Sequence, residues 1–450
     1  MQKYSYFLLK IIWFYFFSAL SVFIERSRNQ PTHRKTGFFE KIFEKLPLSK
    51  HIFIFWLSIF LGACDISRNK DIEPSEVFVK IYENNQFDNN FTPLDIKQTT
   101  DGGYLILGEY TGSAFSPFPA VYLMKIQADG RFEWEYKATD NYVTPISELL
   151  PTSEGNYEFF CSAQSDSLKP IRLSAEQSPR ELAKYNLIRA LRANLLADGN
   201  YGFVSYPQNS QNTIVATGNP TGGIIRQKQY YNQDNTFIEG QLIRHFQRTR
   251  ILFPILMGSR SNGNDLFFTA FRLSTITLMS DDLASTNPEP KVIINGNGYD
   301  TAISALEPIS GNTFAMARYN ADGENVFVPK ADVPANGIFT NTSFRGNILP
   351  ELSKFARVVI RKATIAQRNV TMYLSDTKNG QIVLFIYDQN TGNLIRTRYF
   401  GSSNTFQAGN FTLTQDGGIA IVGKNFVAGR FARICLFKLS PKEVEEWVNQ

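Results

Sequence analysis

A short turn motif recurs along most of the chain and constrains its fold more than any other feature. Thr100-Asp101-Gly102-Gly103 precedes an apolar run at 104–108, and Gln415-Asp416-Gly417-Gly418 precedes a similar run at 419–423. The glycines of the strong and weak copies are Gly102, Gly155, Gly199, Gly263, Gly311 and Gly417, with a degenerate copy near 368. Glycine accepts positive φ without a Cβ clash, so Asp-Gly and Asn-Gly pairs between β-rich runs predict tight hairpins.

The copies are about 50 residues apart, which divides residues 76–450 into seven units. The first unit shows further β-rich runs at 121–126 and 132–136, joined by Ala128-Asp129-Gly130. Four short strands every 50 residues are typical of one blade of a β-propeller. A two-sheet sandwich is the main alternative, and it fits this length and period less well.

Strand chemistry favours the same architecture. The run at 382–387 is apolar on both faces, whereas an antiparallel strand with one wet face alternates. Residues 131–136 do alternate between polar and aromatic side chains, as expected for the outer strand of a blade. We therefore predict an all-β protein, a β-propeller of seven four-stranded blades, in which each sheet covers the flat sides of its neighbours.

Two segments begin with residues that are typical of a helix amino terminus. Ser178-Pro179-Arg180-Glu181 resembles a capping box before 182–195, but the repeat phase needs strands there, and we predict strand. Ser440-Pro441-Lys442-Glu443 carries the same signature. If that tail is helical, the last blade lacks an outer strand, which residues 77–82 can supply, so that both termini close the ring.

The units resemble the Asp-Gly-Gly-type propeller repeats of secreted and surface bacterial proteins. The resemblance covers roughly residues 75–447, and the motif is good only in the first and last units.

The leader ends in the most specific motif of the chain. An apolar run at 52–63 follows Lys50 and ends in Leu61-Gly62-Ala63-Cys64. Twelve residues are too short to cross a bilayer comfortably and are typical of a secretory signal. The motif resembles a bacterial lipobox, which implies a diacylglycerol thioether on Cys64, cleavage before it, and fatty acylation (palmitate) of the new amino terminus.

The first 45 residues fit a lipoprotein signal poorly. A second apolar stretch at 11–24 is either a membrane helix over about 4–24 or the product of a start site placed too far upstream. We favour the misplaced start, with a signal at about 46–63. Residues 64–75 are predicted to be a polar tether, followed by a propeller domain at 76–450.

Charge distribution argues against a nucleic-acid partner. Of 46 Lys and Arg, 9 lie in residues 1–63 with 3 Glu, so residues 64–450 hold 37 basic and 38 acidic residues. We predict the bacterial cell envelope as the location. Asp65 resembles the inner-membrane retention signal of some enterobacteria, but other groups use different rules, and we favour the outer membrane.

Catalytic signatures are scarce. Beyond Cys64 the one histidine is His245, whose arginine neighbours favour its neutral form; we predict a surface residue in a basic strand or loop. Neither metal-ligand spacing nor a phosphate or dinucleotide loop is present, so we expect no metal and no cofactor. Cys161 and Cys435 fall in units that are not neighbours, and we predict two buried thiols.

Carboxylates remain as candidates, because a glycosidase needs only two of them. Asp281, Asp282 and Asp300 are candidates, and 295–300 is a weak candidate for calcium. Aromatic residues in 229–237 could stack on sugars, although packing is the more common use. Turn chemistry explains Asp101, Asp129, Asp198 and Asp416.

These features favour a monomeric, lipid-anchored binding or scaffold module with a protein or glycan ligand, rather than an enzyme. The alternative is a carbohydrate-active enzyme, a carboxylate-based glycosidase or lyase on the same fold. Two close carboxylates in a deep pocket, one with a raised pKa, would favour the enzyme.

Overall fold

The computed structural model describes residues 77–449, except for 83–88, 112–118, 139–141, 153, 164–165, 174–178, 183–184, 234–236, 250–252, 262, 299 and 428–430. All described residues belong to one compact unit, Glu73–Gln450. The predictions for the leader, Cys64 and the tether lie outside the described residues. Within the described part, no helix has the length and apolar character needed to span a bilayer.

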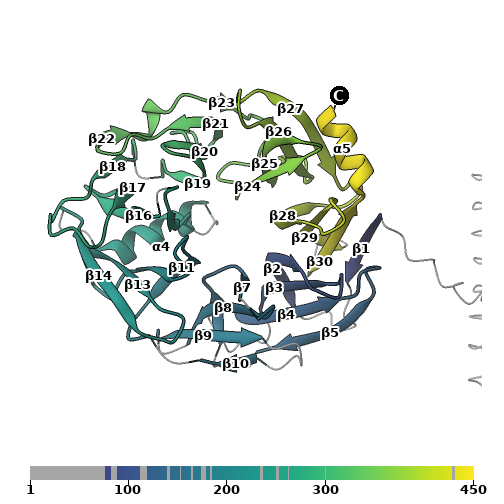
Figure 1. Ribbon diagram of the computed structural model, residues 1–450, viewed down its shortest axis with the longest axis horizontal. Helices are drawn as coiled ribbons and strands as arrows, with labels where there is room; N and C mark the ends of the chain where they lie inside the picture. The colour runs from purple at the N-terminus through teal and green to yellow at the C-terminus, as the bar shows by residue number, and fades with distance from the viewer. Residues whose placement is uncertain are drawn as a thin grey trace, which may run out of the picture. The chain divides into compact units, whose positions relative to one another are not determined.

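Antiparallel sheets of sequence-local strands are arranged in a ring (Figure 1). The first unit contains β2 (Asn90–Gln98), β3 (Tyr104–Thr111), β4 (Ala120–Ile126) and β5 (Phe132–Lys137). The second contains β7 (Leu150–Pro151), β8 (Tyr157–Ser162), β9 (Leu168–Leu173) and β10 (Pro179–Glu181). The third contains β11 (Ala190–Leu195), β12 (Tyr201–Ser205), β13 (Asn212–Gly218) and β14 (Ile224–Tyr231).

The remaining units continue around the ring. The fourth contains β15 (Met257–Ser259), β16 (Leu266–Arg272), β17 (Thr275–Asp281), β18 (Val292–Asn295) and β22 (Gly337–Thr340). The fifth contains β19 (Ile303–Ser310), β20 (Thr313–Tyr319), β21 (Asn325–Asp332) and β23 (Asn347–Ile348), with the 3₁₀ turn η1 (Asn341–Ser343). The sixth contains β24 (Val359–Ile365), β25 (Arg368–Asp376), β26 (Ile382–Asp388) and β27 (Leu394–Phe400).

Both chain ends contribute to the last sheet. It has the order β1-β30-β29-β28, built from β28 (Phe406–Leu413), β29 (Ile419–Val427), β30 (Phe431–Leu439) and β1 (Phe78–Tyr82). Phe78 lies opposite Lys438 and Tyr82 opposite Ile434 in an antiparallel register. This is the pairing that the sequence predicts for residues 77–82. The tail is helical, as α5 (Pro441–Asn449), and leaves that edge to β1.

The sheets do not all have four strands. The first two units form one nine-stranded sheet, because β6 (Val143–Pro145) pairs with both β4 and β8. In the fourth unit, β22 adds in parallel to β18. The described residues thus form six sheets from the seven repeat units, and the count of seven blades stays a prediction. Within the described residues, the sheets follow one another around a ring and do not form the two facing layers of a sandwich (Figure 1).

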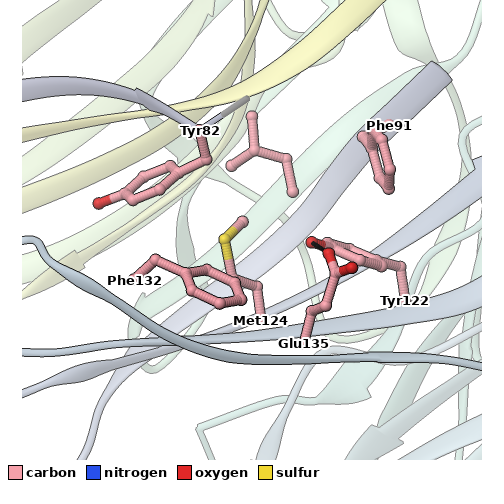
Figure 2. A pocket seen from close by; sticks show the side chains of 7 residues that line it. Tyr82, Phe91, Tyr122, Met124, Phe132 and Glu135 are labelled. Carbon is pink, nitrogen blue, oxygen red and sulfur yellow. Dashed lines mark hydrogen bonds between the residues drawn. The ribbon is translucent and has the colours of Figure 1, made fainter. Parts of the chain in front are cut away.

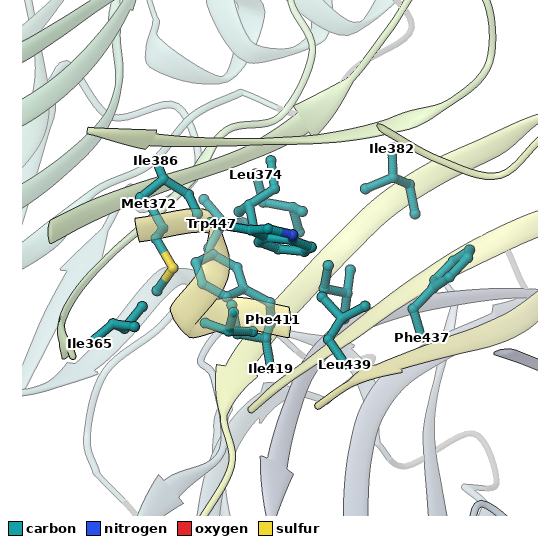
Figure 3. Close-up of a cluster of buried hydrophobic side chains, with 14 of the residues drawn as sticks. Ile365, Met372, Leu374, Ile382, Ile386, Phe411, Ile419, Phe437, Leu439 and Trp447 are labelled. Carbon is teal, nitrogen blue, oxygen red and sulfur yellow. The ribbon is translucent and has the colours of Figure 1, made fainter. Parts of the chain in front are cut away.

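The core lies between successive sheets. Strand β26 is buried along its whole length, as its two-sided apolar sequence predicts. Apolar side chains of the sixth and last sheets, with Trp447 of α5, interlock in one cluster (Figure 3). The Trp447 ring also packs against Phe400. Another cluster joins the last sheet to the first unit through residues such as Leu436 and Ile106. Cys161 and Cys435 are buried thiols in such clusters, as predicted.

The repeated turns have the predicted backbone. All six motif glycines have positive φ, for example 80° at Gly102 and 87° at Gly417. The degenerate copy differs, because its turn uses Ala366 and Gln367 at φ of 48° and 65°. Residues 179–181 and 190–195 are strands, so the repeat phase outweighed the capping-box signature.

We predict that Gln367→Gly stabilises the protein. A non-glycine residue in the left-handed region costs about 1 kcal/mol, and glycine removes that cost. The free energy of unfolding in urea should rise by about 1 kcal/mol. Gly417→Ala is the matched control: its Cβ would meet only Pro441, at 3.7 Å, so backbone strain alone should lower stability by about 1–2 kcal/mol. A loss of stability in Gln367→Gly would contradict this account.

Candidate functional site

Charged side chains from distant parts of the sequence converge near the axis of the ring. The innermost strands β2, β11, β24 and β28 lie around the centre (Figure 1). We call the converging group the axial network; its residues are Asp95, Lys97, Glu148, Arg192, Arg357, Arg361 and Asn410. Glu148 lies between β6 and β7, and Arg357 immediately precedes β24.

Asp95 is the buried centre of this network, with none of its surface exposed. Lys97 Nζ lies 3.1 Å from Oδ1 and 3.0 Å from Oδ2. Asn410 Nδ2 donates to Oδ1 at 2.9 Å, and the Leu149 backbone N–H donates to Oδ2 at 2.8 Å. Both carboxylate oxygens are therefore fully engaged by protein donors.

Glu148 is the second carboxylate and connects three cations. Arg361 Nη2 donates to Oε2 at 2.6 Å, and Lys97 Nζ lies 3.4 Å from the same oxygen. Arg192 Nη2 is 3.9 Å from Oε1. Because Lys97 contacts both acids, Asp95 and Glu148 form a close pair of carboxylates.

The two acids have opposite pKa shifts. Burial raises the pKa of Asp95 despite the nearby Lys97. Burial would also raise the pKa of Glu148, but Arg361, Lys97 and Arg192 hold it well below its ordinary value. Such a divergence is the pattern of acid–base pairs in enzymes. Here the acid with the raised pKa is Asp95. It is buried and both of its oxygens already accept hydrogen bonds from the protein, so it cannot reach a substrate.

A second charged group borders the network. Glu109 at the end of β3, Asp376 at the end of β25 and Lys424 of β29 influence one another electrostatically. Burial raises the pKa of Glu109, and it raises the pKa of Asp376 to about 7, while Asp376 Oδ1 accepts from the Ala408 N–H. Burial lowers the pKa of Lys424.

The prediction of a surface histidine at 245 is wrong. His245 lies on α4 (Ile238–Thr249), an insertion between β14 and β15, and only 1% of its surface is exposed. The insertion lies between the turns at Gly199 and Gly263, whose spacing of 64 residues exceeds the period of about 50. Nδ1 is 3.0 Å from Asp300 Oδ1, and Arg248 binds the other oxygen of Asp300. Burial and Arg248 lower the pKa of His245 to about 4.

The structure thus brings His245 and Asp300 together, but as an anchor for α4. Phe253 packs on the imidazole with ring centroids 4.9 Å apart. An enclosed imidazole with this pKa is neutral at pH 7 yet has no access to a substrate. Asp300 of the 295–300 segment is engaged by the His245 ring and by Arg248. Among the described residues, no group of three His, Cys, Asp or Glu could hold a metal.

Other sequence candidates have structural roles. Asp281 pairs with Lys228 Nζ at 2.5 Å and accepts from the Tyr230 hydroxyl at 2.8 Å, whereas Asp282 accepts from the Ala284 N–H. Asp281 and Asp282 therefore do not join Asp300 in one site. The four turn aspartates each accept a backbone N–H two residues ahead, as predicted: Asp101, Asp129, Asp198 and Asp416. In the 229–237 segment, the Tyr230 ring packs on the Phe268 ring, with centroids 4.9 Å apart.

A small cavity lies apart from the axial network, where the first unit meets the last sheet. Figure 2 shows its lining: Tyr82, Phe91, Tyr122, Met124, Phe132, Glu135 and Ile434. Its volume of about 30 Å³ is enough to hold water. Glu135 is engaged by the Tyr122 hydroxyl at 2.7 Å and by Lys137 at 2.8 Å. Phe132, on the outer strand β5, is 51% exposed at the rim.

The axial network was not predicted from the sequence. One signal was present, because charged residues interrupt the apolar inner strands at Asp95, Lys97 and Arg361. Superimposing the repeat units would have placed these residues on equivalent strands. It would not have shown that they touch.

Comparison with known proteins concerns the fold alone. No family model matches the chain, and no curated protein matches its sequence. The chain is similar to the β-propeller domain of the Trilobed protease from Pyrococcus furiosus, with 7% identity over 78% of this chain and 95% of that one and a TM-score of 0.42. A structure from an analysis of two prolyl endopeptidases has 10% identity over 79% of this chain and 50% of that one, also with a TM-score of 0.42.

This chain therefore spans about half the length of that second structure. Its own ring of sequential antiparallel sheets defines a β-propeller.

We predict that Asp376→Asn stabilises the protein increasingly as the pH rises. The folded pKa of about 7 lies above the ordinary value of 3.8, so ionisation between these values costs the folded state stability. Asparagine keeps an acceptor for the Ala408 N–H without a charge. In urea unfolding, the stability gained by Asp376→Asn should grow by about 1–3 kcal/mol between pH 5 and pH 8. Asp198→Asn, in an exposed turn, is the control; an equal gain at both pH values would contradict the prediction.

Proposed function

We propose that this chain is a lipid-anchored protein of the bacterial cell envelope whose β-propeller is a binding or scaffold module. One observation carries the preference for binding over catalysis: both oxygens of Asp95, the acid that shares Lys97 with Glu148, are held by protein donors. A general acid must have an oxygen free for its substrate. The charged side chains of the axial network are therefore arranged to hold a ligand rather than to transfer a proton to it.

The proposed anchor rests on Leu61-Gly62-Ala63-Cys64 and on the apolar run before it. At about 0.8 kcal/mol for each buried CH₂, two or three acyl chains hold a protein on a bilayer almost permanently. We propose the outer membrane as the site, with a protein or glycan as ligand and a monomeric propeller.

Replacing Cys64 tests the anchor. In a bacterium that expresses the full chain, the wild type should fractionate with outer membranes, and mass spectrometry should find acyl chains on an amino-terminal Cys64. Cys64→Ala should shift the protein to the soluble fraction. Cys161→Ala, which removes a buried thiol of β8, should leave fractionation unchanged. Membrane retention of Cys64→Ala without lipid on the wild type would refute the lipobox assignment.

One observation favours the alternative, a carbohydrate-active enzyme. Glu109 and Asp376 both have raised pKa values and border Lys424 outside the saturated pair. Released reducing ends or unsaturated sugars can be measured on a panel of bacterial and plant polysaccharides. We expect no release by the wild type. Release that disappears in Asp376→Asn, a variant expected to fold, would establish the enzyme instead.

A further inference from the structure

Two arginines of the axial network have unused hydrogen-bonding capacity. A guanidinium carries five N–H donors. In the described part of the chain, Arg357 donates from Nη2 to the Leu94 carbonyl at 3.1 Å, and no carboxylate lies within ion-pairing distance. Arg192 Nε is buried without an acceptor among the described residues, and its nearest carboxylate oxygen, on Glu148, is 3.9 Å from Nη2.

These arginines belong to one connected group. Arg192 and Arg361 both face Glu148. Arg361 also contacts Asn410, which shares the Leu94 carbonyl with Arg357. The pKa of Arg192 and that of Arg357 are lowered, first by burial and also by the neighbouring arginines. The three guanidinium groups therefore concentrate positive charge around a small region.

The acids that face this region do not cancel it. Asp95 and Glu148 are engaged as described above. Burial raises the pKa of Glu109, Glu307 and Asp376, which disfavours their charged forms. Lys97, whose pKa Asp95 and Glu148 raise despite its burial, adds further positive charge, whereas burial lowers the pKa of Lys424. Glu148 is the one acid of this set whose pKa is lowered.

The side chains remain reachable from solvent. Arg192 and Arg361 keep 28% and 29% of their side-chain surface exposed, and Lys97 keeps 22%. They project from β11, β24 and β2, which lie on the inside of the ring (Figure 1). A small solute that enters along the axis can therefore reach them.

Geometry and charge select the chemistry of the ligand. The planar fork of a guanidinium matches the paired oxygens of a carboxylate or a phosphate. We propose that Arg192 and Arg357, supported by Arg361, form a binding site for a small oxyanion at the axis of the propeller. This inference rests on the proposed binding function and names its ligand class: a ligand that presents a carboxylate or phosphate group.

Calorimetric titration of the purified full chain with inorganic phosphate and with acetate tests the site. We expect saturable binding of at least one probe, weakened at least tenfold in Arg192→Met and in Arg357→Met. Arg357→Lys, which keeps the charge but loses the fork, should be intermediate and guards against misfolding of the methionine variant. Arg131→Met, at an exposed turn residue whose side chain is 68% exposed, is the matched control.

Each outcome of these titrations either supports the oxyanion site or overturns it. Preference for acetate or for phosphate identifies the oxyanion that is recognised. Absence of saturable binding, equal weakening in Arg131→Met, or full binding by either axial methionine variant would overturn the site. The fractionation of Cys64→Ala is independent of these titrations, so failure of the oxyanion site is distinguishable from failure of the envelope assignment.

Discussion

Packing of sheet against sheet around the ring is the interaction on which the rest of the structure depends. A strand such as β26, buried on both faces, is stable only if a second and a third sheet cover it. Burying each large apolar side chain contributes about 1.5–3 kcal/mol, and the clusters between sheets collect many of them. The pairing of β1 with β30 matters for the same reason, because it completes the last sheet, which packs against the first unit.

Ring closure also produces the chemistry at the axis. Inner strands of several units meet there, and Arg361 reaches Glu148 across 213 residues of sequence. The desolvation of these charges is offset because nearly every donor and acceptor around Asp95 and Glu148 is paired. The exceptions are Arg192 and Arg357, whose unused donors distinguish the proposed binding site from a purely structural network.

Local features were predictable where the cause is local. Positive φ at Gly102 and Gly417 follows from the turn chemistry of their own neighbours, and so does the helix that begins at Pro441. His245 was not predictable in this way. Its helix interrupts the repeat, and its burial depends on Phe253 and Asp300, which other segments bring to it. Asp281, a candidate for catalysis in the sequence, is instead held by Lys228 and Tyr230 of a neighbouring sheet.

By itself the sequence determined the period, the strands, their two-sided burial and the all-β ring, because turn chemistry and apolar patterning act over a few residues. It also contains the motif that ends at Cys64, on which the proposed lipid anchor rests and which occupies about a dozen consecutive positions. Only the tertiary structure decided which charges meet at the axis, that β6 joins two units in one sheet, and that His245 is enclosed. Those outcomes depend on contacts between residues far apart in the chain, and no local pattern encodes which distant side chain will arrive.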